Sequence, residues 1–519
     1  MTSKDYTRAE TIHTDFILPS DFLFGVSNAA YQVEGGYNRG DGPRNNWWEW
    51  ERDGKVEDPG DTCRFWDRYM EHMELAASHG LNAFRLSLEW ARIQPSTSEQ
   101  KTSPPPFDGK ALDRYAEIVG AVMDAGMAPV VTLLHFTHPA WCGVDLWLDD
   151  DMVDLFVAFV AHSAREINQR LVQAGKRPIR LWVTLNEPNL LGLLTYVTGE
   201  HPHTEKGIAA ARRASENMMI AHVRAYNAVH DLYEEMGWAR PEVSFNNYNM
   251  CIYSLDKAYF DLMRAPSRGI DKGGLGDYFK AKQAAWDSRF LELACARWGR
   301  NSFPTLYYRF INKVYSRLSN PAHIERAIDA AYDSQRKELV DFLGLDIYDP
   351  FSPAVAPRFP TPRRLREREP LLHTPLWENR YDPDEFGGVI RGYSEGAGTL
   401  PIYVLESGMC HRQPKDDVAA PRKDGLTRDV FLKRMLGEIV KCVSEGVPIK
   451  AYSFWSLTDN YEWGSFEPRF GLHEYDFSRG EIRETDGQGI SAGKIYGELI
   501  SAMRSGDPGK ISKAFDSNP

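Results

Sequence analysis

Eight short apolar segments of strand-forming type are spaced along most of the sequence. In chain order they are FLFGVSNA (22–29), AFRLSLEW (83–90), PVVTLLHF (129–136), RLWVTLNE (180–187), EVSFNNYN (242–249), VDFLGLDIY (340–348), IYVLESG (402–408) and IKAYSFWSL (449–457). They are rich in β-branched and aromatic residues and nearly continuously apolar, which is typical of strands buried on both faces. Such strands occur mostly in parallel sheets that helices cover.

Amphipathic helical patterns lie between these segments. Apolar residues recur at helix spacing over 108–126, before a stop at Gly126, and again over 426–446. Eight strands joined by crossover helices close most naturally into an α/β fold of the TIM (β/α)₈ barrel type. A doubly wound open sheet is the alternative, and it is disfavoured because no segment carries the GxGxxG turn.

The remaining stretches fit one barrel domain over residues 1–519. The Pro- and Arg-rich stretch 350–380 is predicted to be an extended loop between the sixth and seventh strands. Polar tails are expected at about 1–15 and 506–519.

Charge and hydropathy exclude several classes of partner. The 519 residues carry a formal net charge of −12, which argues against nucleic acids and anionic membranes. No stretch approaches 18 apolar residues, so no membrane span is predicted. The polar N-terminus lacks an apolar signal-like region, and we therefore expect a cytoplasmic protein.

The six cysteines are scattered singly, without a CxxC pair or a histidine-spaced cluster. This spacing is unlike that of zinc sites and dense disulfide frameworks. We therefore predict no metal site and no cofactor.

Polar residues occur at the carboxyl end of almost every predicted strand, which is where barrel enzymes place their chemistry. In chain order they are Gln32, Arg85, His135, Asn186, Glu187, Asn247, Asp346, Tyr348, Glu406, Trp455, Glu462 and Trp463. A ring of this kind around one mouth is the pattern expected of an active site.

Two members of this ring, Glu187 and Glu406, end nearly opposite strands. Either one alone reads equally well as a capping or loop carboxylate. Two facing carboxylates, however, fit the cleavage of a glycosidic bond, in which one acts as acid and base and the other as nucleophile or base. The separation of the two carboxyls decides between retention and inversion, and sequence does not give it.

Six dispersed motifs resemble those of glycoside hydrolase family 1, the retaining β-glycosidases. They are YQVEG (31–35), LLHF (133–136), TLNEPN (184–189), YVLESG (403–408), WSLTDNYEW (455–463) and RFGL (469–472). The resemblance extends from about Phe24 to about Asp476. NEPN, LEWARI and NNWWEW look closer to the archaeal-type branch of the family.

The resemblance implies a role for each matched residue. Glu187 would be the acid/base, Glu406 the nucleophile and Asn186 a donor to the sugar 2-hydroxyl. Five further residues would hold the non-reducing sugar: Gln32, His135, Trp455, Glu462 and Trp463. On physical grounds Arg85 would keep Glu406 ionised, and Tyr348 would donate to its other oxygen.

The chain departs from the family pattern at a few positions. Asp346 stands where the family has Asn, Ser407 follows the nucleophile in place of Asn, and the loop 464–468 is one residue short. An extra negative charge at Asp346 would perturb the pKa of Glu187 or Glu406.

The expected activity is hydrolysis of unphosphorylated β-D-glucosides or β-D-galactosides, with a small glycoside as partner. Two alternatives remain: a transglycosylase of the same fold and, less favoured because both glutamates are present, an inactive glycan-binding relative. A homo-oligomer is compatible with the sequence.

Overall fold

Eight parallel strands form a closed barrel in this protein, whose computed structural model describes residues 16, 18–40, 42–95, 104–352, 375–414 and 418–516. The order around the barrel is β1-β2-β3-β4-β5-β6-β7-β9. The bounds are β1 (Leu23–Ser27), β2 (Ala83–Ser87), β3 (Ala128–Thr132), β4 (Leu181–Asn186), β5 (Glu242–Tyr248), β6 (Leu343–Asp346), β7 (Ile402–Ser407) and β9 (Ile449–Trp455). Seven of the predicted segments contain one of these strands, and the segment 129–136 overlaps β3, which begins one residue earlier at Ala128, so the predicted barrel is confirmed.

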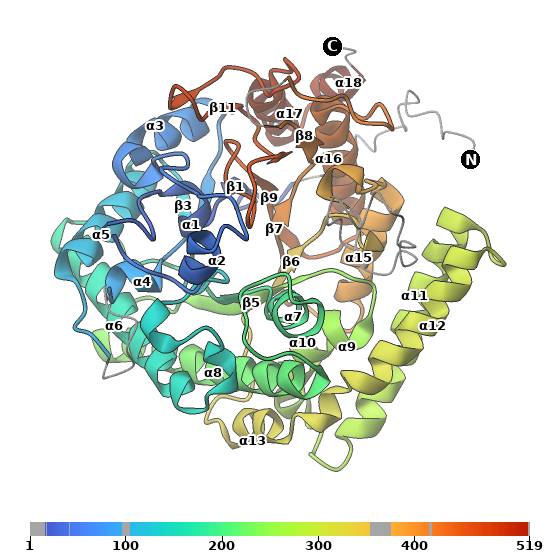
Figure 1. The fold of residues 1–519 in the computed structure, drawn as a ribbon. Helices are drawn as coiled ribbons and strands as arrows, with labels where there is room; N and C mark the ends of the chain where they lie inside the picture. The colour runs from blue at the N-terminus through green and yellow to red at the C-terminus, as the bar shows by residue number, and fades with distance from the viewer. Residues whose placement is uncertain are drawn as a thin grey trace.

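Helices surround the strands (Figure 1). The longer ones are α3 (Phe65–Ser78), α5 (Gly109–Asp124), α6 (Asp151–Gln173), α8 (Ile208–Met236), α10 (Ala258–Arg264), α11 (Leu275–Trp298), α12 (Phe303–Leu318), α13 (Glu325–Asp333), α15 (Pro383–Ser394), α16 (Arg428–Ser444), α17 (Ala492–Ser505) and α18 (Pro508–Asp516). Short helices follow several strand ends: α1 (Ala30–Val33), α2 (Trp48–Arg52), α4 (Trp90–Ile93), α7 (Pro188–Gly192) and α9 (Tyr253–Asp256). Small two-stranded ladders join β8 (His411–Arg412) to β10 (Pro468–Arg469), and β11 (Tyr475–Asp476) to β12 (Glu481–Ile482).

The helix predicted over 108–126 is α5, and its ends follow from its sequence. The Asp108 side chain accepts a hydrogen bond of 2.8 Å from the Lys110 amide, which caps the first turn. Gly126 follows the last turn at a φ of +77°, a conformation that glycine adopts without strain. The second predicted helix, over 426–446, is α16, so both helix predictions are confirmed.

Two apolar layers hold the barrel together. Inside it, a small cluster of buried side chains fills the space between the strands: Val130, Leu181, Val183, Phe342, Tyr403, Leu405 and Ala451. A much larger cluster lies between the strands and the surrounding helices. The interior packing lies toward one end of the barrel and leaves the carboxyl ends of the strands to polar residues, as in other barrels of this type.

The outer regions differ in part from what the sequence suggested. Residues 508–516, expected in a polar tail, form α18 and bury Ile511 and Phe515. The N-terminal tail and residues 353–374 of the expected loop lie outside the described residues, and the 383–394 stretch beyond that loop is α15. All six cysteines are free thiols.

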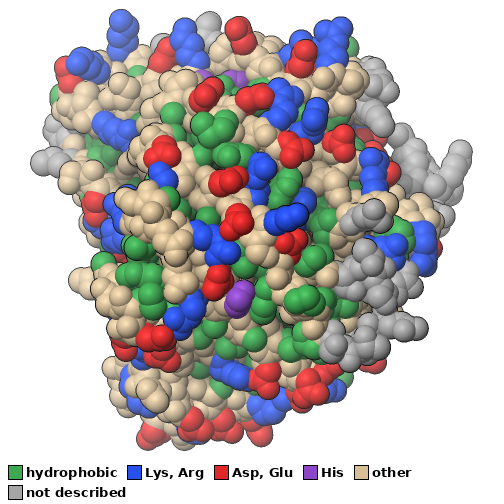
Figure 2. Space-filling model, turned by 90° about the vertical axis from the view of Figure 1, so that its left-hand side faces the viewer, with side chains coloured by type: hydrophobic (Ala, Val, Ile, Leu, Met, Phe, Trp, Pro, Cys, Tyr) green, Lys and Arg blue, Asp and Glu red, His purple; other side chains and the backbone are tan. Residues whose placement is uncertain are grey.

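The surface is mixed in charge. On the face shown in Figure 2, acidic and basic side chains are interspersed, and no field of one sign covers that face. Among the described residues, no helix is both long and apolar enough to cross a membrane.

Candidate active site

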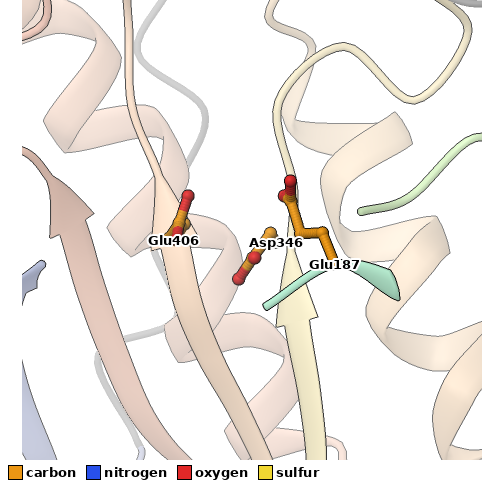
Figure 3. Close-up of side chains that lie close together, drawn as sticks. All are labelled: Glu187, Asp346 and Glu406. Carbon is orange, nitrogen blue, oxygen red and sulfur yellow. The ribbon is translucent and has the colours of Figure 1, made fainter. Parts of the chain in front are cut away.

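Three carboxyl side chains lie close together at the carboxyl ends of strands β4, β6 and β7 (Figure 3). Glu187 directly follows β4, Asp346 ends β6 and Glu406 lies in β7. One oxygen from each can be chosen so that all three lie within 4.8 Å of one another. The three side chains are buried: Glu187 and Glu406 are each 4% exposed and Asp346 is 0% exposed.

Irregular strand pairing aims these side chains. The β6–β7 register shifts between Leu345 and Asp346, which sets Asp346 opposite Glu406. Glu187 adopts φ +42° and ψ +55°, and Pro188 then begins α7. Bulges and left-handed residues re-aim side chains in this way and concentrate at functional sites.

Glu406 is held by two donors. One oxygen forms an ion pair with Arg85, and the other accepts a hydrogen bond of 3.0 Å from the Tyr348 hydroxyl. Burial raises the pKa of Glu406 above its ordinary value, while Arg85 and Tyr348 act in the opposite direction. Arg85 and Tyr348 therefore lie where the sequence predicted, but their effect on this pKa is smaller than that of burial.

Glu187 has a pKa raised well above its ordinary value. The largest cause is burial, followed by the negative charges of Asp346 and Glu406. The pKa of Asp346 is also raised well above its ordinary value, first by burial and then by the negative charge of Glu406. Glu187 is thus suited to carry a proton in a site where Glu406 has a cationic partner.

An amide network joins these groups below the mouth. Arg85 donates to Asn186 Oδ1 at 2.6 Å, and Asn246 Nδ2 donates to the same oxygen at 2.8 Å and also to Asp346. The sequence pointed to Asn247, whose side chain instead donates to the carbonyl of Asp256. Side chains alternate along a strand, so an error of one position exchanges the residue that faces the site for one that does not.

The residues expected to hold a sugar also lie together. Gln32 Nε2 donates to Glu462 Oε2 at 3.0 Å, while the His135 ring is stacked at 5.8 Å from Trp455 and at 5.8 Å from Trp463. Burial, and then the charge of Glu406, raises the pKa of Glu462 to about 8, while Trp455 and Gln32 oppose the shift. Burial and the charge of Arg85 hold the pKa of His135 well below its ordinary range, so its ring is neutral.

Several buried polar atoms of this group have no hydrogen-bond partner among the described residues. They include Gln32 Oε1, His135 Nδ1 and Asn186 Nδ2. Buried polar groups are normally paired, so three unpaired atoms in one site indicate capacity for a polar ligand. Acceptor and donor atoms beside indole rings suit the hydroxyls and the apolar faces of a sugar.

Sequence reasoning missed the aromatic residues that support Trp463. Its ring lies 5.7 Å from Trp47, 4.9 Å from Phe136 and 5.7 Å from His201. The sequence NNWWEW contains Trp47, but nothing in the sequence assigns it to Trp463 rather than to the core. His138 and Cys410, which lie near the mouth, are buried side chains, and each is hydrogen-bonded to a backbone carbonyl.

The three carboxylates also form a group that could hold a cation. Arg85 already faces this group through Glu406, and the raised pKa values of Glu187 and Asp346 favour protons on it. Protons held on Glu187 and Asp346 beside the Arg85 cation would equip the same group for acid–base chemistry.

Comparison with known proteins agrees with this geometry. The family model described as "Glycosyl hydrolase family 1" matches residues 14–503. β-Glucosidase A of Thermotoga maritima is 26% identical over 471 residues, covering 89% of this chain and 93% of that protein. A 6-phospho-β-galactosidase of Clostridium acetobutylicum is 26% identical over 489 residues, covering 88% of this chain and 92% of that protein.

Two further likenesses bear on activity and fold. A rice protein named "Probable inactive beta-glucosidase 14" is 25% identical over 502 residues, covering 88% of this chain and 87% of that protein. The solved family 1 β-glucosidase of Thermotoga maritima superposes with a TM-score of 0.65 at 22% identity, covering 95% of this chain and 99% of that one. The family match spans most of the sequence, and the same barrel underlies it. The chain belongs to glycosyl hydrolase family 1.

Proposed function

We propose that the protein is a retaining β-glycosidase that hydrolyses unphosphorylated β-D-glucosides or β-D-galactosides. Glu406 attacks the anomeric carbon while Glu187 protonates the leaving oxygen, and Glu187 then deprotonates the water that releases the sugar. The observation that carries this proposal is the close approach of Glu187 and Glu406, with oxygens within 4.8 Å. Retaining enzymes place their carboxyls about 5 to 5.5 Å apart, whereas inverting ones leave about 6.5 to 9.5 Å for a water.

The contacts of the two glutamates support different roles for them. Glu406 has Arg85 on one oxygen and Tyr348 on the other, which favours the ionised form that attacks. Glu187 has no cation in ion-pair contact among the described residues, and its raised pKa favours the protonated form that an acid needs. The rice relative named as probably inactive shows that membership alone does not establish activity, but both glutamates are present here.

Rejection of phosphorylated sugars follows from the segment 464–468, GSFEP, which contains no Lys or Arg. Glu467 in this segment forms an ion pair with Arg412. Glu462, just before the segment, offers a carboxyl group and no positive charge. With a pKa of about 8, Glu462 is mostly protonated at pH 7, so the missing cation matters there more than charge repulsion. A phosphate dianion buried without a cation would lose its hydration without compensation.

The test compares kcat/KM for nitrophenyl β-glucoside, nitrophenyl β-galactoside and the 6-phosphate of each. We expect activity on a neutral substrate and less than about a hundredth of it on its 6-phosphate, a difference of about 2.7 kcal/mol. A preference for the phosphorylated substrate would contradict the assignment of Glu462 and 464–468 to the sugar pocket. Product analysis with an added alcohol acceptor separates hydrolysis from transglycosylation.

A further inference from the structure

Asp346 is the feature of this site that the proposed reaction does not use. Its side chain is fully buried at the end of β6, beside both catalytic glutamates. Asn246 donates to Asp346 Oδ2, while the buried Oδ1 has no hydrogen-bond partner among the described residues. An oxygen of Asp346 lies within 4.8 Å of an oxygen of Glu187, so the two carboxyl groups face each other across a short gap.

Two carboxyl groups hydrogen-bond only when at least one of them carries a proton, because an ionised carboxylate has no donor. Asn246 occupies one side of Asp346 as a donor, which leaves the free oxygen as an acceptor toward Glu187. Resting on the function proposed above, we propose that Asp346 and Glu187 share one proton, and that Asp346 is a positioning residue that keeps this proton on the acid/base.

The surrounding charges favour a single shared proton. The titratable and charged groups that face Glu187 come from several elements: Asp346 on β6, Glu406 on β7, Arg85 on β2, Tyr248 on β5 and Tyr348 just after β6. Glu462 after β9 and the neutral His135 after β3 lie beyond them. Arg85 is the one cation of this set and is paired with Glu406. Two further ionised carboxylates within 4.8 Å of each other would have no positive charge to balance them, and like charges in such pairs hold a proton between them.

The shared proton fits both halves of the reaction. In the first, the Glu406 oxygen bonds to the anomeric carbon, the bond from that carbon to the leaving oxygen breaks, and the Glu187 proton moves to the leaving oxygen. Glu406 is then an uncharged ester, and the pair is doubly ionised. In the second, water bonds to the anomeric carbon, its proton returns to Glu187 and Glu406 leaves as a carboxylate. The negative charge of Asp346 makes Glu187 a stronger base in this step.

The first test follows the pair without turnover. Aspartate labelled with ¹³C at the carboxyl gives an Asp346 resonance, identified by its loss in Asp346→Asn. In the unmodified protein we expect this resonance to change in two pH steps, because the two groups titrate as a pair. In Glu187→Gln we expect one step. One step at the same pH in both proteins would overturn the proposal.

The second test uses the pH profile of kcat/KM on phenyl β-glucoside, whose leaving group needs the proton. In Asp346→Asn the charge that raises the pKa of Glu187 is gone, so the alkaline limb should move to lower pH by about one unit or more. An unmoved limb in an active variant would overturn the proposal, because a purely structural role for Asp346 changes the rate without moving the limb. If neither protein turned over any β-glycoside, the proposed function would fail, and the carboxyl titration would still decide whether the proton is shared.

Discussion

Glu406 is the side chain on which the proposed reaction depends most. Glu406→Gln keeps the size of the side chain and its contact with Tyr348 but removes the nucleophilic charge. We expect kcat to fall by about 10⁴-fold or more, as when other nucleophiles are removed, with the far-ultraviolet circular dichroism unchanged. Glu438→Gln on α16 is the matched control, since Glu438 is also buried and pairs with Arg391 away from the mouth. Full activity in Glu406→Gln, or equal loss in the control, would contradict the assignment.

The role of Glu187 can be distinguished from that of Glu406 by how the effect of its substitution depends on the leaving group of the substrate. Glu187→Ala should slow phenyl β-glucoside far more than dinitrophenyl β-glucoside, because the activated phenolate leaves without a proton. Azide should restore the second step, because it attacks the glycosyl ester without needing a base, whereas water needs Glu187 to deprotonate it. The check is kcat/KM over a series of aryl leaving groups with and without azide. A uniform loss with no response to azide would assign Glu187 another role.

The end of β7 offers an element-level test of how strand packing positions the nucleophile. A Cβ atom on Gly408 would overlap the carbonyl of Trp455 at the end of β9, whereas a Cβ on Gly437 in α16 would meet nothing closer than a Phe515 ring atom at 4.0 Å. Gly408→Ala should therefore lower the free energy of unfolding by about 1 to 3 kcal/mol and reduce kcat. Gly437→Ala should raise stability by about 0.4 to 1 kcal/mol at unchanged kcat. Urea unfolding measures both, and equal effects would contradict the packing argument.

The elements that sequence could predict are those whose pattern is local. The eight strands and helices α5 and α16 follow from apolar runs and from periodicity, each read within about 20 residues. The close approach of Asp346 to Glu187 could not be predicted in this way, since it depends on the shifted β6–β7 register and on the backbone conformation of Glu187. The sequence pointed to Asn247 instead of Asn246 for a similar reason. Which of two successive side chains faces the site cannot be read from the sequence where the β4–β5 pairing is irregular.

The C-terminal residues show a related limit. Residues 508–516 read as a polar tail because their few apolar side chains are widely spaced. Ile511 and Phe515 become buried because they pack in the folded molecule, where α18 contacts α17. Tertiary packing overrides local polarity in such segments.

The whole molecule should lose stability as the pH rises from 6.5 to 8. Burial raises the pKa of Glu89 to about 7 and that of Glu462 to about 8. The folded protein then binds more protons than the unfolded one in this window, so the free energy of unfolding falls with rising pH, by up to about 1.4 kcal/mol per pH unit for each such group. Buried His72 and His222, whose pKa values are lowered from 6.5 to about 4, have the opposite effect on stability, and that effect fades as the pH rises above 6.5.

Urea unfolding at pH 6.5, 7.25 and 8 measures this dependence. The matched variant is Glu89→Gln, whose side chain still accepts from Thr137, and the fall in stability should be smaller in it. Stability that rises across the window would contradict the burial of these carboxyls in protonated form.

Covalent trapping tests the proposed reaction most directly. In a 2-deoxy-2-fluoro β-glucoside the fluorine slows both steps of the reaction. A reactive leaving group lets the first step proceed nonetheless, so a retaining enzyme accumulates its glycosyl ester. After proteolysis, mass spectrometry of the peptide containing IYVLESG should show one fluorosugar on Glu406, and none in Glu406→Gln. Inactivation with the label on another residue, or turnover of the ordinary substrate with no label at all, would contradict double displacement through Glu406.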